Sequence, residues 1–531
     1  MEKVWPLIAI AVIFASVFSL TLMLIYSYDE GRFVYVLDDA YIHMAVAKHM
    51  AQNGVWGITR EGFTSLSSSP LWTLLLSGMY RLAGPGELLP LAMNGIAALA
   101  VLGLFHALLL QIGLGSGQRF LLLAAFLFLT PLPAAVFTGQ EHVLHIGLTL
   151  WLAWAAARAL APSREEEAPA AILGVCIPAF LAAAVRYESA FLIAGAALLF
   201  FIKRKYKWGT LVAVSGTLPL MLYGSLSAAL GWSWLPNSVL LKGHPPDWHS
   251  PASIAASLGY TAYRQLLSTP HLLFPVLGAL LLLIFAPARA PIFRSRAAVL
   301  ASLFIMTTLL HLQYARTGWF YRYEAYLMGL AALALAAAMP DLRAVWRSLN
   351  SASKALSVAL LVLAGLPLLL RGYGALVSVP AASRNIYEQQ IQTASFLHLY
   401  YEGRTVAAND IGAINYFADL RCLDLWGLAS RDVAALKLKG RYTTDAIASL
   451  AVSSGARIAV IYESWFHDYG GLPAAWIKEG SWKIQDNIVC GSDTISFYAV
   501  APDEAEPLRT HLREFAPHLP GRVIQAGPYI Q

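Results

Sequence analysis

Residues 5–27, WPLIAIAVIFASVFSLTLMLIYS, form an apolar segment without a single charged side chain. A helix needs about 20 apolar residues to cross the hydrocarbon core of a bilayer, so this segment is long enough. It is longer than the apolar part of a cleavable signal peptide, and no small-residue cleavage site follows it. We therefore interpret it as an uncleaved membrane anchor.

The remainder of the chain repeats this apolar pattern. Of its 531 residues, 58% are hydrophobic and only 13% are charged, which excludes soluble enzymes and disordered proteins. Further apolar spans are predicted at 88–110, 119–137, 141–160, 170–186, 188–203, 209–230, 271–287, 297–313, 323–339 and 355–371. The sequence therefore predicts a polytopic α-helical membrane protein with about 11 transmembrane helices. A shorter apolar stretch, 70–82, is interpreted as a juxtamembrane or re-entrant helix.

Basic residues set the expected orientation. With the N-terminus inside, the predicted inner segments are richer in Lys and Arg than in acids, and Lys203-Arg204-Lys205-Tyr206-Lys207 is the strongest marker. An odd number of spans then places the C-terminus outside. We expect a multi-pass protein of the bacterial inner membrane with a cytoplasmic N-terminus. The net charge of +6 reflects this distribution, and no nucleic-acid partner is expected.

The chain changes character after Arg371. Residues 372–531 mix charged and apolar residues as soluble domains do, and begin with a polar helix predicted at 384–402. Runs typical of β-strands follow at 405–408, 457–462 and 495–500. This pattern favours a small extracytoplasmic α/β domain, which we expect to be periplasmic. The predicted membrane domain is then 1–371, with a long first outer loop at 28–87.

Unusual polar clusters gather on the outer side under this topology. Asp38 and Asp39 are adjacent acids in the first outer loop, near the point where the chain leaves the membrane. Similar clusters occupy later outer turns: Gln140-Glu141-His142, Arg186-Tyr187-Glu188, Asn237 with Lys242, and Arg316 with Arg322-Tyr323. Short turns need no charged residues to be stable. Acids and bases that converge on one face therefore indicate a site for a charged headgroup.

The segment after Asp39 has the pattern of an amphipathic helix. Tyr41, Ile42 and Ala45 begin an apolar stripe at helical spacing, so the helix is predicted to lie along the membrane surface. Asp38 falls at the end of this stripe, facing the membrane and the protein core, where partial desolvation makes a carboxylate a better general base. The alternative is that either acid simply caps the following helix, because Asp is a preferred N-cap residue.

The same segments resemble motifs of the GT-C glycosyltransferases, most closely the bacterial arabinofuranosyltransferase-like and protein-mannosyltransferase-like members. Asp38-Asp39-Ala40-Tyr41-Ile42 is similar to the family's first outer loop. Gly139-Gln140-Glu141-His142 resembles a later G-M-E-T/H segment, with Gln140 in place of Met. Further similarities, in chain order, are Arg186-Tyr187-Glu188 with Tyr187 in place of Pro, Leu235-Pro236-Asn237-Ser238 with Lys242, Arg322-Tyr323, and Asn409-Asp410.

The resemblance implies a membrane enzyme that transfers a sugar, with inversion, from a polyprenyl-phosphate donor to a glycan, lipid or protein acceptor at the outer face. Asp38 would be the general base. Asp39 would orient groups or bind a divalent cation, although no motif demands a metal. The donor phosphate would contact Arg186, Lys242 and Arg322. The expected substrate-binding residues are Tyr41, His43, Glu141, His142, Glu188, Asn237, Tyr323 and Asp410.

Two other classes of protein are alternatives. A lipid-linked sugar transporter or flippase places ionisable residues near the bilayer midplane and often has repeated halves, whereas the charges here fall on one face and the sequence has no visible repeat. A non-catalytic protein that binds an envelope polymer would need its outer domain but not Asp38.

Overall fold

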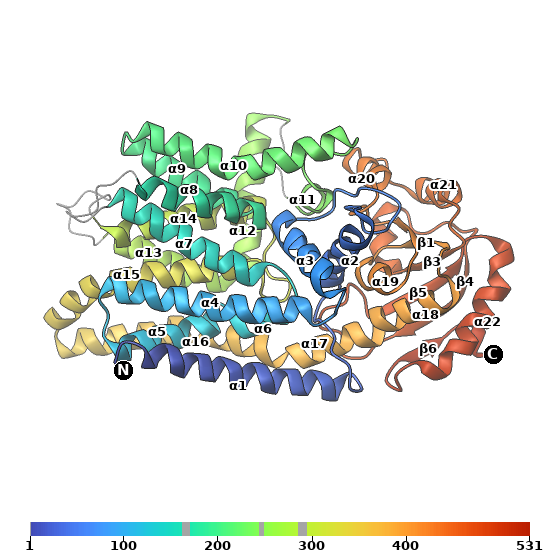
Figure 1. Ribbon diagram of the computed structural model, residues 1–531, viewed down its shortest axis with the longest axis horizontal. Helices are drawn as coiled ribbons and strands as arrows, with labels where there is room; N and C mark the ends of the chain where they lie inside the picture. Colours follow the sequence, from blue (N-terminus) through green and yellow to red (C-terminus); the bar gives the residue numbers. More distant parts are fainter. Residues whose placement is uncertain (1, 162–169, 244–248, 285–294) are drawn as a thin grey trace.

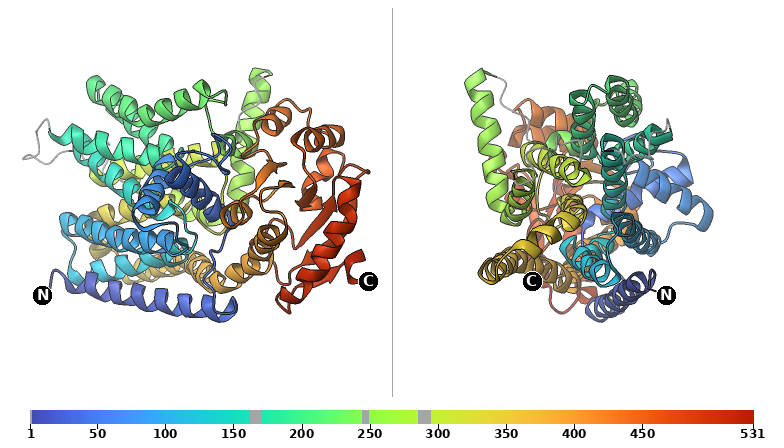
Figure 2. Two further views of the ribbon diagram at one scale, coloured as in Figure 1. Left: turned by 45° about the vertical axis from the view of Figure 1, so that its right-hand side comes forward. Right: turned by 90° about the vertical axis from the view of Figure 1, so that its left-hand side faces the viewer.

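A bundle of long helices and an α/β domain at one end of it make up the computed structural model (Figure 1). The structure describes residues 2–161, 170–243, 249–284 and 295–531. The N-terminus lies at the end of the bundle opposite the α/β domain, and many bundle helices are seen end-on from that side (Figure 2). The two ends of the bundle therefore differ, since only one of them carries a folded domain.

Apolar helices of the bundle coincide with the predicted spans. Among the described residues, seven helices are long and apolar enough to cross a membrane: α1 (Trp5–Tyr28), α4 (Leu89–Ile112), α7 (His142–Leu160), α10 (Tyr206–Ala229), α14 (Arg296–Tyr314), α15 (Ala325–Ser348) and α16 (Ser351–Val377). The shorter apolar helices are α5 (Ser116–Leu129), α8 (Ala170–Val185), α9 (Ser189–Ile202) and α13 (Leu273–Ile284). The chain is thus a polytopic helical membrane protein, while the predicted number of crossings stays a prediction.

Two spans depart from single continuous helices. The span predicted at 119–137 breaks after α5, because Pro131 and Pro133 cannot continue a helix, and it resumes as the short α6 (Leu132–Val136). The second is the span predicted at 271–287. Its helix α13 follows α12 (Pro251–Ser268) across a bend of 96°, and the sequence did not predict α12. Residues 285–287, the end of the span predicted at 271–287, lie outside the described residues.

The first outer loop contains both helices that the sequence predicted there, α2 (Asp38–Asn53) and α3 (Pro70–Ala83). They lie between the bundle and the α/β domain (Figure 1). The apolar stripe of α2 is covered by protein, because α2 packs against α3 on one side and against α19 (Gly412–Phe417) on the other. The sequence predicted that Asp38 faces the membrane and the protein core. Asp38 is indeed buried, but it faces the α/β domain.

The α/β domain is built on a six-stranded sheet in the order β2-β1-β3-β5-β4-β6. Its strands are β1 (Thr405–Ala408), β2 (Arg421–Asp424), β3 (Ile458–Ile461), β4 (Ile477–Lys483), β5 (Thr494–Ala499) and β6 (Ile524–Ala526). The first three are parallel and the last three antiparallel to their neighbours. The other helices of this part of the chain are α17 (Val379–Ile386), α18 (Gln392–Tyr400), α20 (Arg431–Leu438), α21 (Thr444–Ser454) and α22 (Ala505–Phe515). Strands β1, β3 and β5 confirm the three predicted runs.

The bundle and the α/β domain are packed into one structure. A single hydrophobic core runs from Ile10 in α1 to Phe497 in β5. Polar contacts reinforce it, since Ser383 of α17 donates a hydrogen bond to Asp29 just after α1. Lys48 of α2 donates to the carbonyl oxygen of Tyr416 in α19 over 2.6 Å. This packing holds one end of the membrane helices against the sheet domain, where the predicted site residues meet.

Candidate active site

Asp39 lies in the first turn of α2, beside two cations. One carboxylate oxygen accepts a hydrogen bond from Nη2 of Arg322, and the other lies 3.9 Å from Nζ of Lys242. Burial acts to raise the pKa of Asp39, but the charges of Lys242 and Arg322 outweigh burial and hold that pKa below its usual range. Asp39 is therefore ionised at neutral pH.

Arg322 is fixed at the start of α15 with its side chain only 2% exposed. Its Nη1 donates to Oε1 of Gln140 over 2.7 Å, and its Nη2 also donates to the hydroxyl of Tyr323 over 3.0 Å. Its Nε has no hydrogen-bond partner among the described residues. A buried guanidinium with an unused N–H is suited to bind an anionic ligand.

The turn between α14 and α15 has an unusual backbone. Gly318 has a φ of +78°, and Trp319, Phe320 and Tyr321 follow with φ of +41°, +58° and +60°. The left-handed region costs a non-glycine residue roughly 1–2 kcal/mol, so the surroundings must hold this turn in place. Arg371 does so from α16, because its Nη2 donates to the carbonyl oxygen of Tyr321 over 3.1 Å.

Arg186 forms a second charged group on the same face. Its Nη1 donates to Oε1 of Glu141 over 2.5 Å, and its Nε donates to Oε2 of Glu188 over 2.9 Å. Burial acts to raise the pKa of Glu188, and the charge of Arg186 lowers it to about 2. Oε2 of Glu141 lies 3.6 Å from Nε2 of His43 and accepts no hydrogen bond from the described residues. The two carboxylates neutralise Arg186 and leave an acceptor atom for a ligand.

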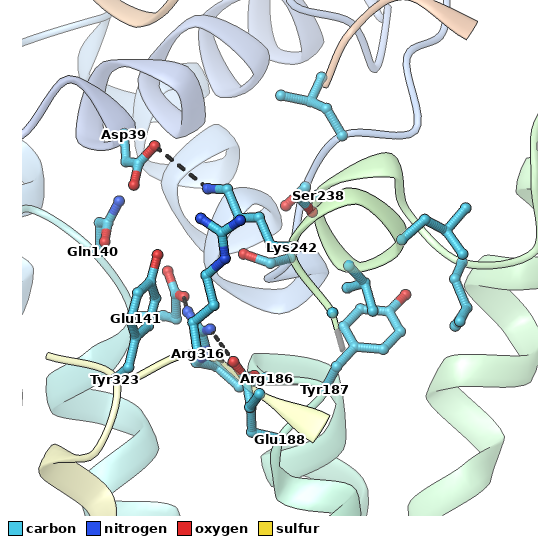
Figure 3. A pocket seen from close by; sticks show the side chains of 18 of the residues that line it. Asp39, Gln140, Glu141, Arg186, Tyr187, Glu188, Ser238, Lys242, Arg316 and Tyr323 are labelled. Carbon is cyan, nitrogen blue, oxygen red and sulfur yellow. Dashed lines mark hydrogen bonds and ion pairs between the residues drawn. The ribbon is translucent and has the colours of Figure 1, made fainter. Parts of the chain in front are cut away.

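These groups line a cavity of about 460 Å³ in the bundle (Figure 3). Its polar lining residues are Asp39, Gln140, Glu141, Glu188 and Tyr323, with the cations Arg186, Lys242 and Arg316 among them. Its apolar wall includes Phe191 of α9, Leu220 of α10, Leu240 of α11 (Asn237–Lys242) and Leu235, which lies just before α11. The cavity thus combines charged groups with an apolar wall. We call it the bundle cavity.

A second cavity of about 610 Å³ lies between the outer turns and the α/β domain. Its walls include Gln390, Asn409, Asp410, Trp426 and Trp465. We call it the interdomain cavity. Four polar or charged residues line both cavities: Asp39, Lys242, Arg316 and Tyr323. Asp39 therefore lies where the two cavities meet.

Asp38 lines the interdomain cavity but not the bundle cavity. Its two carboxylate oxygens accept hydrogen bonds from the backbone N–H groups of Gly412 and Ala413, over 2.6 and 2.7 Å, in the first turn of α19. Asp38 therefore does cap a helix, but that helix is α19 of the α/β domain. Its side chain makes no capping bond to α2, the helix that it was expected to cap in the alternative interpretation of the sequence. Burial, and then the charge of Asp410, raise the pKa of Asp38 well above its usual value.

Asp410 lies beside Asp38 within a buried polar network. Its Oδ2 accepts hydrogen bonds from Nε2 of Gln390 over 2.9 Å and from the hydroxyl of Tyr462 over 3.1 Å. Burial raises the pKa of Asp410. Two neighbouring carboxylates that are both buried favour sharing a proton, so this pair carries less than two negative charges near neutral pH.

Three of the predicted substrate-binding residues line neither cavity. Tyr41 is fully buried and packs its ring against Tyr35 and Phe417. His142 is buried beside Tyr323. Asn237 donates from Nδ2 to the carbonyl oxygen of Gly427 over 2.9 Å, so it links α11 to the α/β domain. The other predicted site residues line at least one cavity. Asp39, Lys242 and Tyr323 line both, and Asp38 and Asp410 line only the interdomain cavity. The residues that line only the bundle cavity are His43, Glu141, Arg186, Glu188 and Arg322.

The structure adds Arg316 to the site. It reaches into the bundle cavity close to Lys242 (Figure 3). The sequence placed Arg316 among the outer polar clusters but gave it no role, because nothing distinguishes an exposed Arg in a turn from one that points into a cavity. In the described part of the chain, no group of three or more His, Cys, Asp or Glu side chains is arranged to hold a metal ion.

The architecture is similar to that of ArnT from Cupriavidus metallidurans, solved bound to undecaprenyl phosphate. The two chains share 14% identity with a TM-score of 0.53, and the match covers 93% of this chain and 98% of that one. The chain therefore shares the fold of ArnT. The membrane bundle with its α/β domain agrees with the GT-C fold that the resemblance implied, and the interdomain cavity lies between these two parts of the molecule.

Other comparisons add little to the GT-C fold. The match to the arabinofuranosyltransferase AftD from Mycobacteria covers 92% of this chain and 41% of the AftD chain, at 12% identity and a TM-score of 0.38. A family model described as a domain of unknown function (DUF8728) matches residues 384–498, which contain most of the sheet. No curated protein matches the chain.

Proposed function

We propose that this protein is a membrane glycosyltransferase that uses a sugar linked to polyprenyl phosphate as its donor. The position of Asp39 carries the proposal, because it lies beside Lys242, Arg316 and Arg322 where the two cavities meet. Transfer between two substrates needs a proton acceptor, cations for a leaving phosphate and a separate approach for each substrate. The fold shared with ArnT supports the proposal, since that protein was solved with undecaprenyl phosphate bound.

The bundle cavity is the proposed donor site. Its apolar wall, with Phe191 and Leu220, suits the first isoprene units of a lipid whose tail lies in the bilayer. Its cations suit the phosphate, and Arg in particular forms paired hydrogen bonds with phosphate oxygens. Of the three cations predicted to bind phosphate, Arg186 is already neutralised by Glu141 and Glu188. We therefore assign the phosphate to Lys242, Arg316 and Arg322.

Asp39 is the proposed general base, a role that the sequence gave to Asp38. Both oxygens of Asp38 are engaged by the α19 backbone, whereas Asp39 faces both cavities. In the absence of donor, the cations keep the pKa of Asp39 low, which makes it a weak base. A donor phosphate competes for Lys242 and Arg322, so donor binding raises the pKa of Asp39 and makes it a better proton acceptor.

The reaction is a single displacement. The oxygen of the acceptor hydroxyl forms a bond to the anomeric carbon from the side opposite the phosphate. The bond between that carbon and the phosphate oxygen breaks, and the hydroxyl proton passes to Asp39, so the configuration is inverted. Polyprenyl phosphate leaves with the bonding electrons, and Lys242, Arg316 and Arg322 stabilise its developing charge. Asp39 is also the oxygen ligand that a divalent cation accompanying the phosphate would meet.

Arg186 and its carboxylates are the proposed sugar-positioning group. Within the described residues, one oxygen of Glu141 has no hydrogen-bond partner, and the buried hydroxyls of Tyr187 and Ser238 have none either. All three residues line the bundle cavity. Sugar hydroxyls supply both donors and acceptors, so they would satisfy these atoms and fix the anomeric carbon near Asp39. The donor would reach this site from the outer leaflet, with the α/β domain in the periplasm.

The test measures release of undecaprenyl phosphate by the purified full-length protein in detergent, with a panel of undecaprenyl-phosphate sugars. Loss of a general base costs roughly 10²–10⁴ in rate, and we expect this loss for Asp39→Asn. We expect Asp38→Asn to lower the rate less and to lower thermal stability, because it weakens the contact with α19. Asp432→Asn, at an exposed acid of α20, is the matched control.

Three outcomes would contradict the proposal, and each leads to a different conclusion. Wild-type rates in Asp39→Asn would overturn the catalytic proposal. A full loss in Asp38→Asn without any change in stability would return the base to Asp38. Movement of intact donor between leaflets, with no release of undecaprenyl phosphate, would support the transporter class instead.

A further inference from the structure

The interdomain cavity is a site of its own, and the donor site does not account for it. At about 610 Å³ it is larger than the bundle cavity and lies within the range of roughly 300–1,000 Å³ typical of small-molecule sites. Asp410, Trp426 and Trp465 line it from the α/β domain. Because the two cavities share Asp39, a molecule bound in the interdomain cavity would present its reactive atom to the proposed base.

The charge of the interdomain cavity disfavours anionic ligands. Among the described residues that line it, the only cations are Lys242 and Arg316. Both also line the bundle cavity, where the donor phosphate is proposed to engage them. Away from that junction, the ionisable groups that carry charge are acids: Asp468, and the pair of Asp38 and Asp410, which shares a proton. A phosphorylated or carboxylated ligand would meet like charge along this wall, which opposes binding.

Two indole rings form a fixed aromatic surface in this cavity. The rings of Trp426 and Trp465 have centroids 4.4 Å apart and are tilted by 55°. Nζ of Lys437 lies 3.3 Å from the centroid of Trp426 and makes no hydrogen bond to the described residues. A cation over an indole face is an attractive contact, so Lys437 holds Trp426 in place. Both Trp residues are half-buried, which leaves part of their apolar surface for a ligand.

Asn409 supplies an unsatisfied hydrogen-bond donor in the same cavity. The residue is 3% exposed, and its Oδ1 accepts the backbone N–H of Tyr462 over 2.9 Å. Its Nδ2 is buried and has no partner in the described chain. A buried amide donor without a partner costs free energy, which a ligand oxygen would recover. The cavity thus offers aromatic faces, a free donor and carboxylate acceptors.

We propose that the interdomain cavity binds the acceptor, and that the acceptor is the uncharged end of a glycan. This inference rests on the proposed glycosyl transfer. The apolar C–H face of a sugar packs on Trp426 and Trp465, and its hydroxyls accept from Asn409 and donate to the acids. The terminal hydroxyl lies at the junction, where it attacks the anomeric carbon and gives its proton to Asp39. The acidic wall repels phosphorylated glycans and so favours a glycan without phosphate.

The experiment compares acceptors in the same release assay. The probes are neutral tetrasaccharides of glucose, mannose, galactose or arabinose, each with and without a terminal phosphate. We expect a neutral probe to accelerate release of undecaprenyl phosphate and to be elongated by one sugar, with its phosphorylated counterpart at least tenfold less efficient. Trp426→Ala should raise the KM for the neutral acceptor about tenfold while leaving the KM for the donor within twofold.

Asn409→Asp is the second variant, because it keeps the oxygen that holds Tyr462 and removes the free N–H₂ group. It should raise the acceptor KM in the same way. Trp346→Ala, at an exposed indole near the far end of α15, is the matched control. An unchanged acceptor KM in both cavity variants, or a preference for phosphorylated acceptors, would overturn this inference while leaving the proposed function standing. No release from any donor would overturn both.

Discussion

The charge state of Asp39 is set by its neighbours more than by its own burial. Burial acts to raise its pKa, and Lys242 and Arg322 reverse that effect. Each cation therefore has two roles in the proposed cycle. It keeps the carboxylate ionised before the donor arrives, and it is then the group that the donor phosphate engages.

Replacing Lys242 with Met should move the acid limb of the pH profile. With one cation removed, the pKa of Asp39 rises, so the base becomes protonated at a higher pH and activity is lost earlier as the pH falls. We expect the acid limb of kcat/KM to shift upward by about one unit or more, together with a higher donor KM. The measurement is kcat/KM for the donor from about pH 2 to pH 8, because the wild-type acid limb lies below the usual pKa of Asp, about 3.9.

The control for this profile is Lys439→Met, which removes an exposed charge at the end of α20. It should leave the acid limb in place. An unchanged limb in Lys242→Met would show that Lys242 does not control the titration of the base.

Sequence reasoning found the residues of the candidate site more readily than their roles. Asp39, Lys242 and Arg322 stood out because charged residues at short outer turns need a reason to be there. The engagement of Asp38 depends on α19, which begins at Gly412 and is remote in the chain, so no local pattern reveals it. Asn409 belongs to the Asn409-Asp410 motif, but the sequence gave it no role. An amide without a hydrogen-bond partner can be recognised only when all its neighbours in the fold are known.

At the scale of secondary structure, the contact between α2 and α19 joins the bundle to the α/β domain. The carboxylate of Asp38 accepts two backbone N–H groups at the first turn of α19, where the helix dipole favours a negative charge. The helices approach closely here because Gly412 has no side chain. A Cβ on Gly412 would lie 2.2 Å from the carbonyl oxygen of Asp38 and 2.5 Å from its Oδ2.

Gly412→Ala should therefore force the two helices apart. Overpacking of this kind costs roughly 1–3 kcal/mol, and we expect a lower Tm and faster proteolysis of the α/β domain in detergent. Gly521→Ala is the control, since a Cβ there meets nothing within 4 Å. Equal stability of the two variants would show that the close approach of Asp38 to α19 does not hold the domains together.

At the scale of the whole molecule, the two ends of the bundle predict its orientation in the membrane. The basic cluster 203–207 lies at the junction of α9 and α10, and the α/β domain packs on the end opposite the N-terminus (Figure 1). Cysteine labelling is a direct test, because the three native thiols are buried or half-buried. We expect Ser454→Cys to react with an impermeant maleimide in spheroplasts. Lys207→Cys should react only after permeabilisation, and the opposite pattern would reverse the orientation.

Hydropathy predicted the membrane fold well because bilayer thickness dictates helix length, and every predicted span overlaps a described helix, although the span 119–137 is broken at Pro131. The strands of the α/β domain were harder to predict. Strands β1, β3 and β5 are apolar runs, whereas β4 contains Lys478, Glu479, Gly480 and Ser481, which have no strand pattern. Strand β2 has four residues and depends on pairing with β1. Short strands are made by their neighbours, so their own residues predict them poorly.

The cation cluster at the junction of the cavities has a kinetic consequence. In the proposed reaction the donor is a phosphodiester with one negative charge, whereas the released lipid is a monoester whose charge approaches two. Lys242, Arg316 and Arg322 would then attract the spent carrier more strongly than the loaded one. We expect departure of the spent carrier into the bilayer to set the pace of turnover. The enzyme would respond to the ratio of loaded to spent carrier in the membrane and slow down as recycling of the carrier falls behind.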